Sequence, residues 1–287
     1  MKEITLSAYA KVNLWLHVGK RRPDGFHDLF SVMQAVSLCD TVQLRQTMET
    51  GISLSVKGNE TLPTNRENLA YRAAEAFLNK VGGNFGIEIT IIKRIPVAAG
   101  LAGGSTDAAA VLKGMNALWG EPLDEEGLLT LATTLGSDVP FCLIGGTCLA
   151  AGRGEVLSPL DIKVPLHFLL VNSGEQVSAK DAYGKIDEYS LAETTFPPPA
   201  SIIFPLEAGD LKGICKEVYN RFEEAVLPMV PIAQSYKQQL IDAGAVAALM
   251  SGSGPTIFAI FESEDEARAT AKKLLFPTIY CQSVIVH

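Results

Sequence analysis

The feature that most constrains this chain is a glycine-rich connection between a strand pattern and a helix pattern. Ile87, Ile89 and Ile91 alternate with polar residues, as in a strand with one buried face. From Ala108 to Trp119 apolar residues recur at helical spacing, which predicts a helix that begins near Ser105 or Thr106. The connection between the two patterns reads Pro96, Val97, Ala98, Ala99, Gly100, Leu101, Ala102, Gly103, Gly104, Ser105 and Thr106.

Glycines in such a connection allow positive φ angles and a close approach of the backbone to a ligand. The N–H groups of the first helical turn, at the positive end of the helix dipole, favour an anion. The connection is not a Walker A loop, because no Lys follows the glycines, and it lacks the G-x-G-x-x-G spacing. Two interpretations therefore stay open at this point, a phosphate-binding turn and a tight connection without a ligand.

Composition narrows the class of protein. A chain of 287 residues with 47% hydrophobic content predicts one large domain or two moderate ones. Its net charge of −8 argues against nucleic-acid and anionic-membrane surfaces, which need a basic field. The sequence shows no signal segment and no apolar run of membrane-spanning length, so we expect a cytoplasmic protein. Five cysteines without a C-x-x-C pair and four histidines without metal-ligand spacing favour buried thiols and no zinc site.

The N-terminal third is predicted to be rich in strands. Residues 4–18 indicate a strand, a break around Lys11, and a second strand, and residues 36–56 indicate further strands. A lone lysine at such a break is ordinarily solvated. The run Arg21-Arg22-Pro23-Asp24-Gly25-Phe26-His27 carries a turn signal, and by itself it is most simply a surface turn with a capping histidine.

Two polar residues lie next to predicted helices. Asn68 precedes a helix over 69–81, and Asp138 follows a helix that runs from Asp124 to Gly136. On the pattern alone, either side chain is a helix cap, which is the ordinary role of Asn and Asp at such positions.

The second half begins near Pro159. A buried strand over 164–171 and a short helix that contains Tyr183 come first, and 193–205, with its run of prolines, predicts a stiff connection. Two helical segments, strands over 245–250, 256–261 and 278–286, and a helix over 265–275 then suit a ferredoxin-like α+β layer. The turn Ser251-Gly252-Ser253-Gly254-Pro255 is on its own a tight hairpin.

In their order along the chain, these motifs resemble those of the GHMP kinases. The resemblance rests on Pro96 to Thr106, on Gly136-Ser137-Asp138-Val139-Pro140-Phe141 and on the turn at Gly252 and Ser253. It implies an α+β, two-domain GHMP kinase fold. An N-terminal mixed-sheet nucleotide-binding domain with an unusual βαβ unit spans 1–158, and a ferredoxin-like domain spans 159–287. It also implies that residues 96–106 bind ATP near Asn68, that Asp138 is catalytic, and that Gly252 and Ser253 support the phosphate loop.

Two further segments are similar to one branch of this family, which phosphorylates the 2-hydroxyl of a methylerythritol carrying cytidine diphosphate, in the non-mevalonate route to isoprenoid precursors. The run Ala10-Lys11-Val12-Asn13-Leu14 implies a catalytic Lys11 beside Asp138 and a substrate contact by Asn13. The run around Phe26 and His27 implies a cytidine pocket, with Phe26 stacked on the base and Tyr183 facing Phe26 across the base.

The implied ligands are ATP as phosphoryl donor, Mg²⁺, and the cytidine diphosphate substrate, with no nucleic acid, membrane or obligate protein partner. Phe26, Ala102 and Thr106 stand where many relatives have Tyr, Gly and Ser. Another alcohol kinase of the family, such as a homoserine kinase, and a non-catalytic ligand sensor on the same fold are the alternatives.

Overall fold

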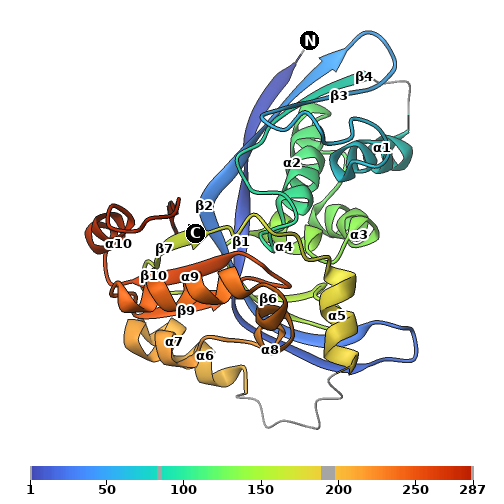
Figure 1. Ribbon diagram of the computed structural model, residues 1–287. Coiled ribbons are helices and arrows are strands. Elements are labelled where there is room, and N and C mark those ends of the chain that lie inside the picture. Colours follow the sequence, from blue (N-terminus) through green and yellow to red (C-terminus); the bar gives the residue numbers. More distant parts are fainter. Residues whose placement is uncertain (1, 83–85, 189–197, 286–287) are drawn as a thin grey trace. The chain divides into compact units, whose positions relative to one another are not determined.

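The computed structural model describes residues 2–82, 86–188 and 198–285, and most of its elements are labelled in Figure 1. They form two compact units. Unit 1 comprises Met1–Ala10, Cys39–Val97 and Ala102–Ile144, and unit 2 comprises Lys11–Leu38, Ala98–Leu101 and Gly145–His287. The units interleave along the chain, because strands β1 (Glu3–Arg21) and β2 (His27–Thr47) each contribute residues to both.

Unit 1 is a mixed sheet covered by helices. Strands β3 (Gly51–Lys57) and β4 (Gly86–Ile92) pair in parallel. Helix α1 (Leu69–Val81) connects them along the chain, which makes a βαβ unit. Strand β4 also pairs antiparallel with residues Thr41–Thr47 of β2. The remaining helices of the unit are α2 (Gly103–Leu118), α3 (Glu125–Leu135) and α4 (Val139–Ile144).

The core of unit 1 explains why the predicted strand and helix flank the glycine-rich segment. Ile87, Ile89 and Ile91 of β4 are all buried, and they belong to one apolar cluster with Phe77 of α1 and Leu112 of α2. The alternation of β4 and the helical spacing of α2 thus bury one face each in a shared core. Both ends of the connection between β4 and α2 are fixed by this packing.

Unit 2 contains a four-stranded antiparallel sheet of order β11-β7-β10-β9. Its strands are β7 (His167–Val171), β9 (Ala247–Met250), β10 (Ile257–Phe261) and β11 (Ile279–Gln282). This order is that of a ferredoxin-like layer, as predicted. The unit also has the hairpin of β5 (Thr147–Ala151) and β6 (Val156–Leu160), and β8 (Tyr219–Asn220), which pairs in parallel with β1.

The helices of unit 2 lie mostly between β7 and β9 in the chain. They are α5 (Ala179–Glu188), α6 (Ala200–Ala208), α7 (Leu211–Glu217), α8 (Phe222–Val226), the 3-10 turn Leu227–Met229, α9 (Pro231–Asp242) and, after β10, α10 (Glu264–Ala271). The predicted stiff connection over 193–205 is wrong at its C-terminal end, where α6 begins. Its residues 193–197 lie outside the described residues, as does Val286 at the end of the last predicted strand.

The predicted break near Lys11 is also wrong, since β1 runs without interruption from Glu3 to Arg21. From Ala10 to Val18 every residue of this strand is buried. A strand covered on both faces loses the alternation of apolar and polar residues that marks a half-buried strand. Polar residues at such positions therefore mimic a break, although the strand continues through them.

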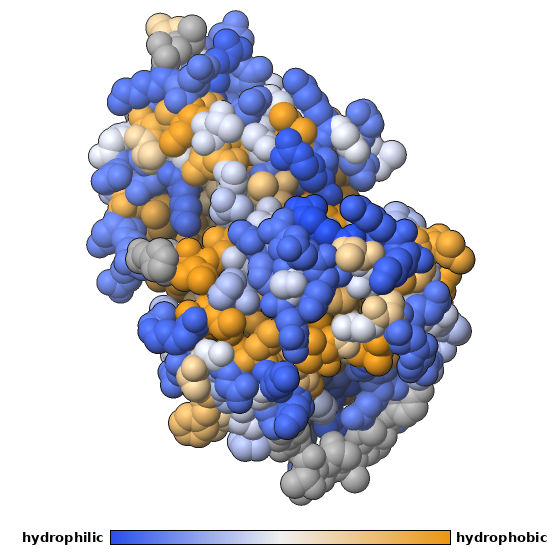
Figure 2. All heavy atoms as spheres, turned by 90° about the vertical axis from the view of Figure 1, so that its left-hand side faces the viewer, coloured by the Kyte–Doolittle hydropathy of each residue, from blue (hydrophilic) through white to orange (hydrophobic). Residues whose placement is uncertain are grey.

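The exposed surface mixes polar and apolar side chains. Figure 2 shows polar residues spread among smaller apolar areas on one face. Large exposed apolar side chains come from separate segments, such as Met48, Phe204 and Leu275. No helix in the described part of the chain has the length and apolar character needed to cross a membrane.

His17 of β1 gives unit 2 a predicted acid sensitivity. The side chain is buried, and its burial, with a smaller effect of the Arg221 guanidinium, lowers the pKa of His17 to about 4. In the unfolded chain the pKa is near 6.5, so the unfolded state binds the proton first as the pH falls. The free energy of unfolding should therefore decrease between about pH 7 and pH 4, by up to about 3 kcal/mol.

The measurement is urea unfolding at several pH values for the wild type and for His17→Gln. The variant should lose less stability than the wild type between pH 7 and pH 5, because it lacks the titrating ring. Equal losses in both proteins would contradict the assignment of this acid sensitivity to His17.

Candidate active site

The glycine-rich segment turns at different residues from those the sequence suggests. Helix α2 begins at Gly103, so Gly103 and Gly104 lie in its first turn rather than in the loop. Positive φ angles occur at Gly100 (74°) and at two alanines, Ala98 (52°) and Ala102 (58°). The left-handed conformation costs a non-glycine residue about 1 to 2 kcal/mol. The segment therefore holds a shape that its own residues do not favour.

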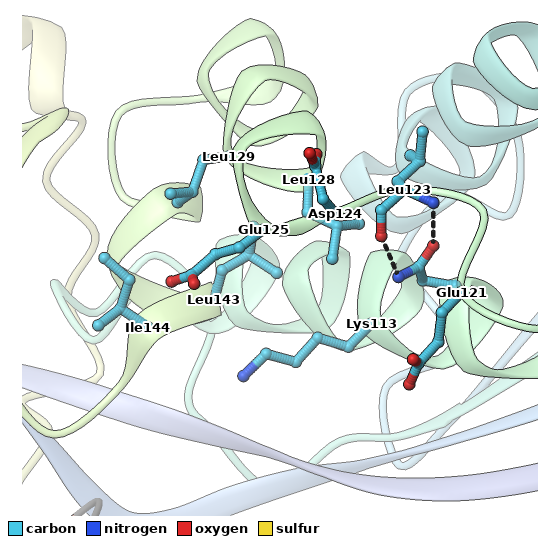
Figure 3. A pocket seen from close by; sticks show the side chains of 10 residues that line it. Lys113, Glu121, Leu123, Asp124, Glu125, Leu128, Leu129, Leu143 and Ile144 are labelled. Atoms are coloured by element: carbon cyan, nitrogen blue, oxygen red, sulfur yellow. Dashed lines mark hydrogen bonds between the residues drawn. The ribbon is translucent and has the colours of Figure 1, made fainter.

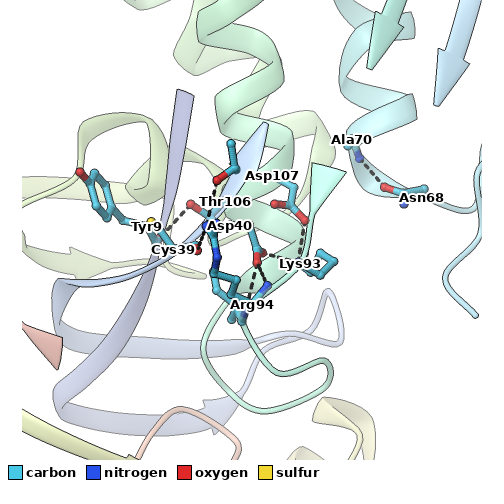
Figure 4. Close-up of polar contacts among 11 residues, drawn as sticks. Tyr9, Cys39, Asp40, Asn68, Ala70, Lys93, Arg94, Thr106 and Asp107 are labelled. Carbon is cyan, nitrogen blue, oxygen red and sulfur yellow. Dashed lines mark hydrogen bonds and ion pairs between the residues drawn. The ribbon is translucent and has the colours of Figure 1, made fainter. Parts of the chain in front are cut away.

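The first turn of α2 presents unused N–H groups. No hydrogen bond of the Gly103, Gly104 or Ser105 N–H is present within the described residues, as expected for the start of a helix. Thr106 differs, because its N–H donates to the Ala102 carbonyl (2.9 Å) and its hydroxyl to the Tyr9 carbonyl (2.7 Å; Figure 4). An anion at this helix end can thus be bound by three N–H groups, while the polar groups of Thr106 are engaged in the protein.

Gly100 is held against the turn after β9. A Cβ atom on Gly100 would lie 2.2 Å from the Ser251 carbonyl oxygen and 3.2 Å from the Gly254 nitrogen, so only glycine fits. The Ser251 hydroxyl donates to the Gly100 carbonyl (3.0 Å), and the Lys11 N–H donates to the Leu101 carbonyl (3.1 Å). Residues 98–101 are therefore anchored by their main chain within unit 2.

Lys11 is a buried lysine, not a solvated one. It is 4% exposed, and its Nζ donates to the Asn13 side-chain carbonyl (2.6 Å). Asn13 in turn donates to the Ser31 hydroxyl (2.8 Å), which donates to the Trp15 carbonyl (2.8 Å). This chain of hydrogen bonds fixes the ammonium group at one position. A buried ammonium with no carboxylate in this chain of bonds is costly, as is common for a group that serves chemistry.

The turn at Gly252 packs directly on this ammonium. A Cβ atom on Gly252 would lie 3.2 Å from Lys11 Nζ, 3.2 Å from the Gly100 carbonyl and 3.3 Å from Asn13 Oδ1. The Asn220 side chain donates to the Gly252 carbonyl (2.8 Å) and so holds the turn in place. Four residues predicted from three distant motifs therefore meet within unit 2. Ser253, the other residue of this predicted support, is partly exposed.

Asn68 and Asp138 lie in unit 1. The Asn68 side chain caps a helix, and the Asp138 side chain does not. Asn68 Oδ1 accepts the Ala70 N–H (3.0 Å; Figure 4), so the helix-cap interpretation of Asn68 is confirmed. Asp138 is partly buried just before α4. No hydrogen bond joins its carboxylate to the first turn of α4 in the part of the chain that the structure describes. Its carboxylate is therefore not used as a cap.

The predicted cytidine-binding residues occupy one part of unit 2. The rings of His27 and Tyr183 stack with their centroids 5.1 Å apart. His27 Nδ1 lies 3.0 Å from the Gly19 carbonyl, and Nε2 lies 3.4 Å from Asp187 Oδ1. Both ring nitrogens thus have partners in the protein, and one face of the His27 ring is covered by Tyr183. A ligand that the His27 ring reads must compete with these partners.

Phe26 is the exposed member of this group. It follows the predicted turn, in which the Phe26 N–H donates to Asp24 Oδ1 (3.1 Å), and half of its surface is exposed (50%). The Arg153 guanidinium, from the turn between β5 and β6, lies 4.7 Å from the ring centroid. An exposed aromatic ring beside a cation is a suitable platform for a base that carries phosphates.

A cavity of about 380 Å³ lies elsewhere in unit 1, between α2, α3 and α4 (Figure 3). Half of its lining residues are aliphatic, with Leu128, Leu129 and Leu143 among them, and the other half are polar or charged, with Lys113 along one side. Burial lowers the pKa of Lys113. None of the residues predicted for the site lines this cavity, so it is separate from the groups described above.

Several residues of the site were missed by sequence reasoning. Ser31 and Asn220 hold Lys11, Asn13 and Gly252 through the hydrogen bonds described above, and Arg153 covers one side of Phe26. Isolated polar residues at strand ends and turns carry no pattern that marks them, since the same residue types are common at any turn. Asn220 comes near the site through the parallel pairing of β8 with β1, which the sequence does not predict.

Comparisons with known proteins agree on the kind of protein. Family models for the N-terminal and the C-terminal domains of GHMP kinases match residues 68–146 and 205–276. The 4-diphosphocytidyl-2-C-methyl-D-erythritol kinase of Gloeobacter violaceus is 44% identical over 274 residues, 94% of this chain and 89% of the relative. That of Syntrophomonas wolfei is 44% identical over 280 residues, 97% and 96% of the two chains. A crystal structure of a 4-(cytidine 5'-diphospho)-2C-methyl-D-erythritol kinase has a TM-score of 0.83 at 33% identity, covering 98% of this chain and 99% of that one.

We expect Gly100→Ala to be severely destabilising, because a Cβ atom on Gly100 would lie 2.2 Å from the Ser251 carbonyl oxygen. The new methyl group meets a main-chain oxygen that cannot move away, and the positive φ adds strain. We expect a loss of about 3 kcal/mol or more in the free energy of unfolding, measured by urea denaturation.

Gly104→Ala is the matched control, because Gly104 is helical and a Cβ atom there meets nothing within 4 Å. Its stability should stay within about 1 kcal/mol of the wild type. Similar stability of the two variants would show that the loop is not held as described.

Proposed function

We infer that this chain, which belongs to the GHMP kinase family, transfers the γ-phosphoryl group of ATP to the 2-hydroxyl of 4-diphosphocytidyl-2-C-methyl-D-erythritol, giving the 2-phosphate and ADP. The observation that carries the inference is the 44% identity to a kinase of that name over 94% of the chain. The enzyme would act in the non-mevalonate route to isoprenoid precursors.

In this proposal, residues 96–106 bind the phosphates of ATP. The N–H groups of Gly103, Gly104 and Ser105 point out of the start of a 16-residue helix, whose dipole favours an anion at that end. Residues 96–102 form the turn before it. Asn68 stays a proposed neighbour of the adenine, with its side chain engaged as the cap of α1.

Mg²⁺ is an expected part of the nucleotide complex. Ser105 is partly buried and its hydroxyl has no hydrogen bond within the described residues, which fits a hydroxyl that can serve as a ligand. The Thr106 hydroxyl is used by Tyr9 and fits this role less well. When bound, the ion would neutralise phosphate charge.

Lys11 and Asp138 are the proposed catalytic residues. Phosphoryl transfer has a loose transition state, so positioning and charge stabilisation dominate the rate. The Lys11 ammonium, fixed by Asn13, would stabilise negative charge on the transferred group. The Asp138 carboxylate would orient the substrate hydroxyl and accept its proton late, as the O–P bond forms.

The substrate's cytidine would bind at the aromatic group of unit 2. The exposed Phe26 ring offers a stacking face for the pyrimidine, and Tyr183 and His27 form the neighbouring wall. Asn13, next to Lys11, would contact the alcohol part of the substrate.

The wider predictions from the sequence remain part of the proposal. We propose an N-terminal ATP-binding domain over 1–158 and a C-terminal domain over 159–287, with the boundary between the family matches that end at 146 and begin at 205. We also propose a cytoplasmic enzyme without a nucleic-acid, membrane or obligate protein partner. The net charge of −8 supports the absence of an anionic partner surface.

The experiment that tests the function is an ADP-release assay with ATP and a panel of alcohols. The panel contains the cytidine diphosphate substrate, mevalonate, homoserine and galactose. We expect ADP release with the first alone. Release with homoserine instead would identify another alcohol kinase, and release with none would favour a ligand sensor.

Asp138→Asn should lower turnover by on the order of 10² to 10⁴, because the amide cannot accept the proton. The affinity for ATP should change little, since Asp138 is not assigned to the nucleotide. Turnover is measured with the same assay and nucleotide affinity by calorimetry. Near-normal turnover of this variant would remove the assignment of Asp138 as the base.

Lys11→Met should lower turnover by about 10² or more, because the ammonium is lost. The free energy of unfolding should fall by no more than about 1 to 3 kcal/mol, because Asn13 Oδ1 loses its donor while a buried charge is removed. Lys57→Met, which changes an exposed lysine on β3, is the control and should be active. If the Lys11 variant retained its turnover, the ammonium would have no catalytic role.

A further inference from the structure

Three charged side chains form a buried cluster beside the glycine-rich segment in unit 1 (Figure 4). Lys93 follows the end of β4, Asp40 lies on β2, and Asp107 lies in α2. The side chains are 6%, 0% and 6% exposed. Lys93 Nζ donates to Asp107 Oδ2 (2.7 Å) and also to Asp40 Oδ2. We call these three residues the charged cluster.

At one end of the segment, the charged cluster fixes the chain that leaves β4. Asp40 Oδ1 accepts the main-chain N–H groups of Arg94 (2.5 Å) and Ile95 (2.9 Å). The same carboxylate accepts Lys93 through its other oxygen. Three consecutive residues before Pro96 are thus bound to one fully buried carboxylate.

At the other end, the charged cluster fixes the start of α2. Asp107 binds Lys93, as described above. Lys93 Nζ also lies close to Gly103. A Cβ atom on Gly103 would be 3.3 Å from Lys93 Nζ and 3.1 Å from Ile95 Cγ2. The charged cluster therefore joins residues 93–95 to residues 103–107, the two ends of the segment that carries the unused N–H groups.

Stability alone does not explain these buried charges. Burial, together with the nearby Asp40 carboxylate, raises the pKa of Asp107 to about 7 against the pull of Lys93. The second oxygen of Asp107 is buried and has no hydrogen-bond partner among the described residues. Apolar side chains of similar size often replace buried ion clusters with no loss of stability. Geometry is the property that an apolar replacement would lose.

We propose that Lys93, Asp40 and Asp107 are positioning residues that hold the two ends of segment 96–102 at a fixed separation, so that the Gly103, Gly104 and Ser105 N–H groups are preset for the phosphates of the nucleotide. The inference rests on the proposed function, in which these N–H groups bind ATP. The charged cluster binds main-chain N–H groups at the β4 end and is joined to α2 through the Asp107 side chain, so its effect on a ligand acts through loop geometry.

The test compares ADP with adenosine, because only ADP uses the phosphate-binding N–H groups. Lys93→Met with Asp107→Leu removes an ammonium and a carboxylate together. The Asp40 carboxylate loses its Lys93 donor and keeps the Arg94 and Ile95 N–H groups. We expect this double variant to bind ADP about tenfold more weakly, or worse, and to bind adenosine as the wild type does. Both affinities are measured by NMR titration, with urea unfolding to show that the variant is folded.

The matched control is Arg45→Met with Glu88→Leu. This ion pair joins the same two strands, β2 and β4, on the exposed side (Arg45 Nε to Glu88 Oε2, 2.8 Å). It should leave both affinities unchanged.

Lys93→Arg is the conservative variant. It should bind ADP more tightly than the double variant does, since the guanidinium keeps a donor between the Asp40 and Asp107 carboxylates. Unchanged ADP affinity in the double variant, or an equal loss for ADP and adenosine, would overturn the positioning role. A wild-type protein that binds adenosine as tightly as ADP would instead remove the proposed phosphate site itself.

Discussion

The structure depends on the contacts that hold residues 96–102, a strained stretch of main chain, in one conformation before the start of α2. Three N–H groups there lack partners within the described residues, and two alanines nearby adopt left-handed angles. Such a stretch does not keep its shape by itself, because its own residues favour other conformations. Its partners come from outside it. The Ser251 hydroxyl binds the Gly100 carbonyl, the Asp40 carboxylate binds two N–H groups before Pro96, and the Thr106 hydroxyl binds β1.

A second feature follows the same principle. Lys11 is fixed by a side chain two residues away on its own strand, and that side chain is fixed by Ser31 on β2. The turn at Gly252 packs on the ammonium because glycine leaves room for it. Lys11, Asn13 and Ser31 therefore lie on the long strands β1 and β2, which restricts their motion more than a loop would.

The sequence predicted the elements whose signal is local. Alternation marked β4, helical spacing marked α2, and Asn68 and Asp124 marked the starts of their helices, where both side chains accept cap hydrogen bonds. Local signals failed where tertiary packing decides. Strand β1 is buried on both faces, so it has no alternation, and its polar residues were interpreted as a break.

The site itself was predictable only in part. Lys11, Asn13, Gly100 and Gly252 were identified by their resemblance to a family, and the structure brings them together in unit 2. The charged cluster had no signal, because Asp40, Lys93 and Asp107 are far apart in sequence and each resembles an ordinary surface charge. Sequence spacing carries no information about which charges a sheet and a helix bring to one point.

The central claim is that main-chain amides at the start of α2 bind the phosphates of a nucleotide. Amide chemical shifts measured by NMR during titration with a non-hydrolysable ATP analogue test it most directly. The account predicts that Gly103, Gly104 and Ser105 are among the residues with the largest shifts, and that adenosine at equal saturation leaves them nearly unchanged. Shifts confined to other parts of the chain, or equal shifts of these three amides with adenosine, would contradict it.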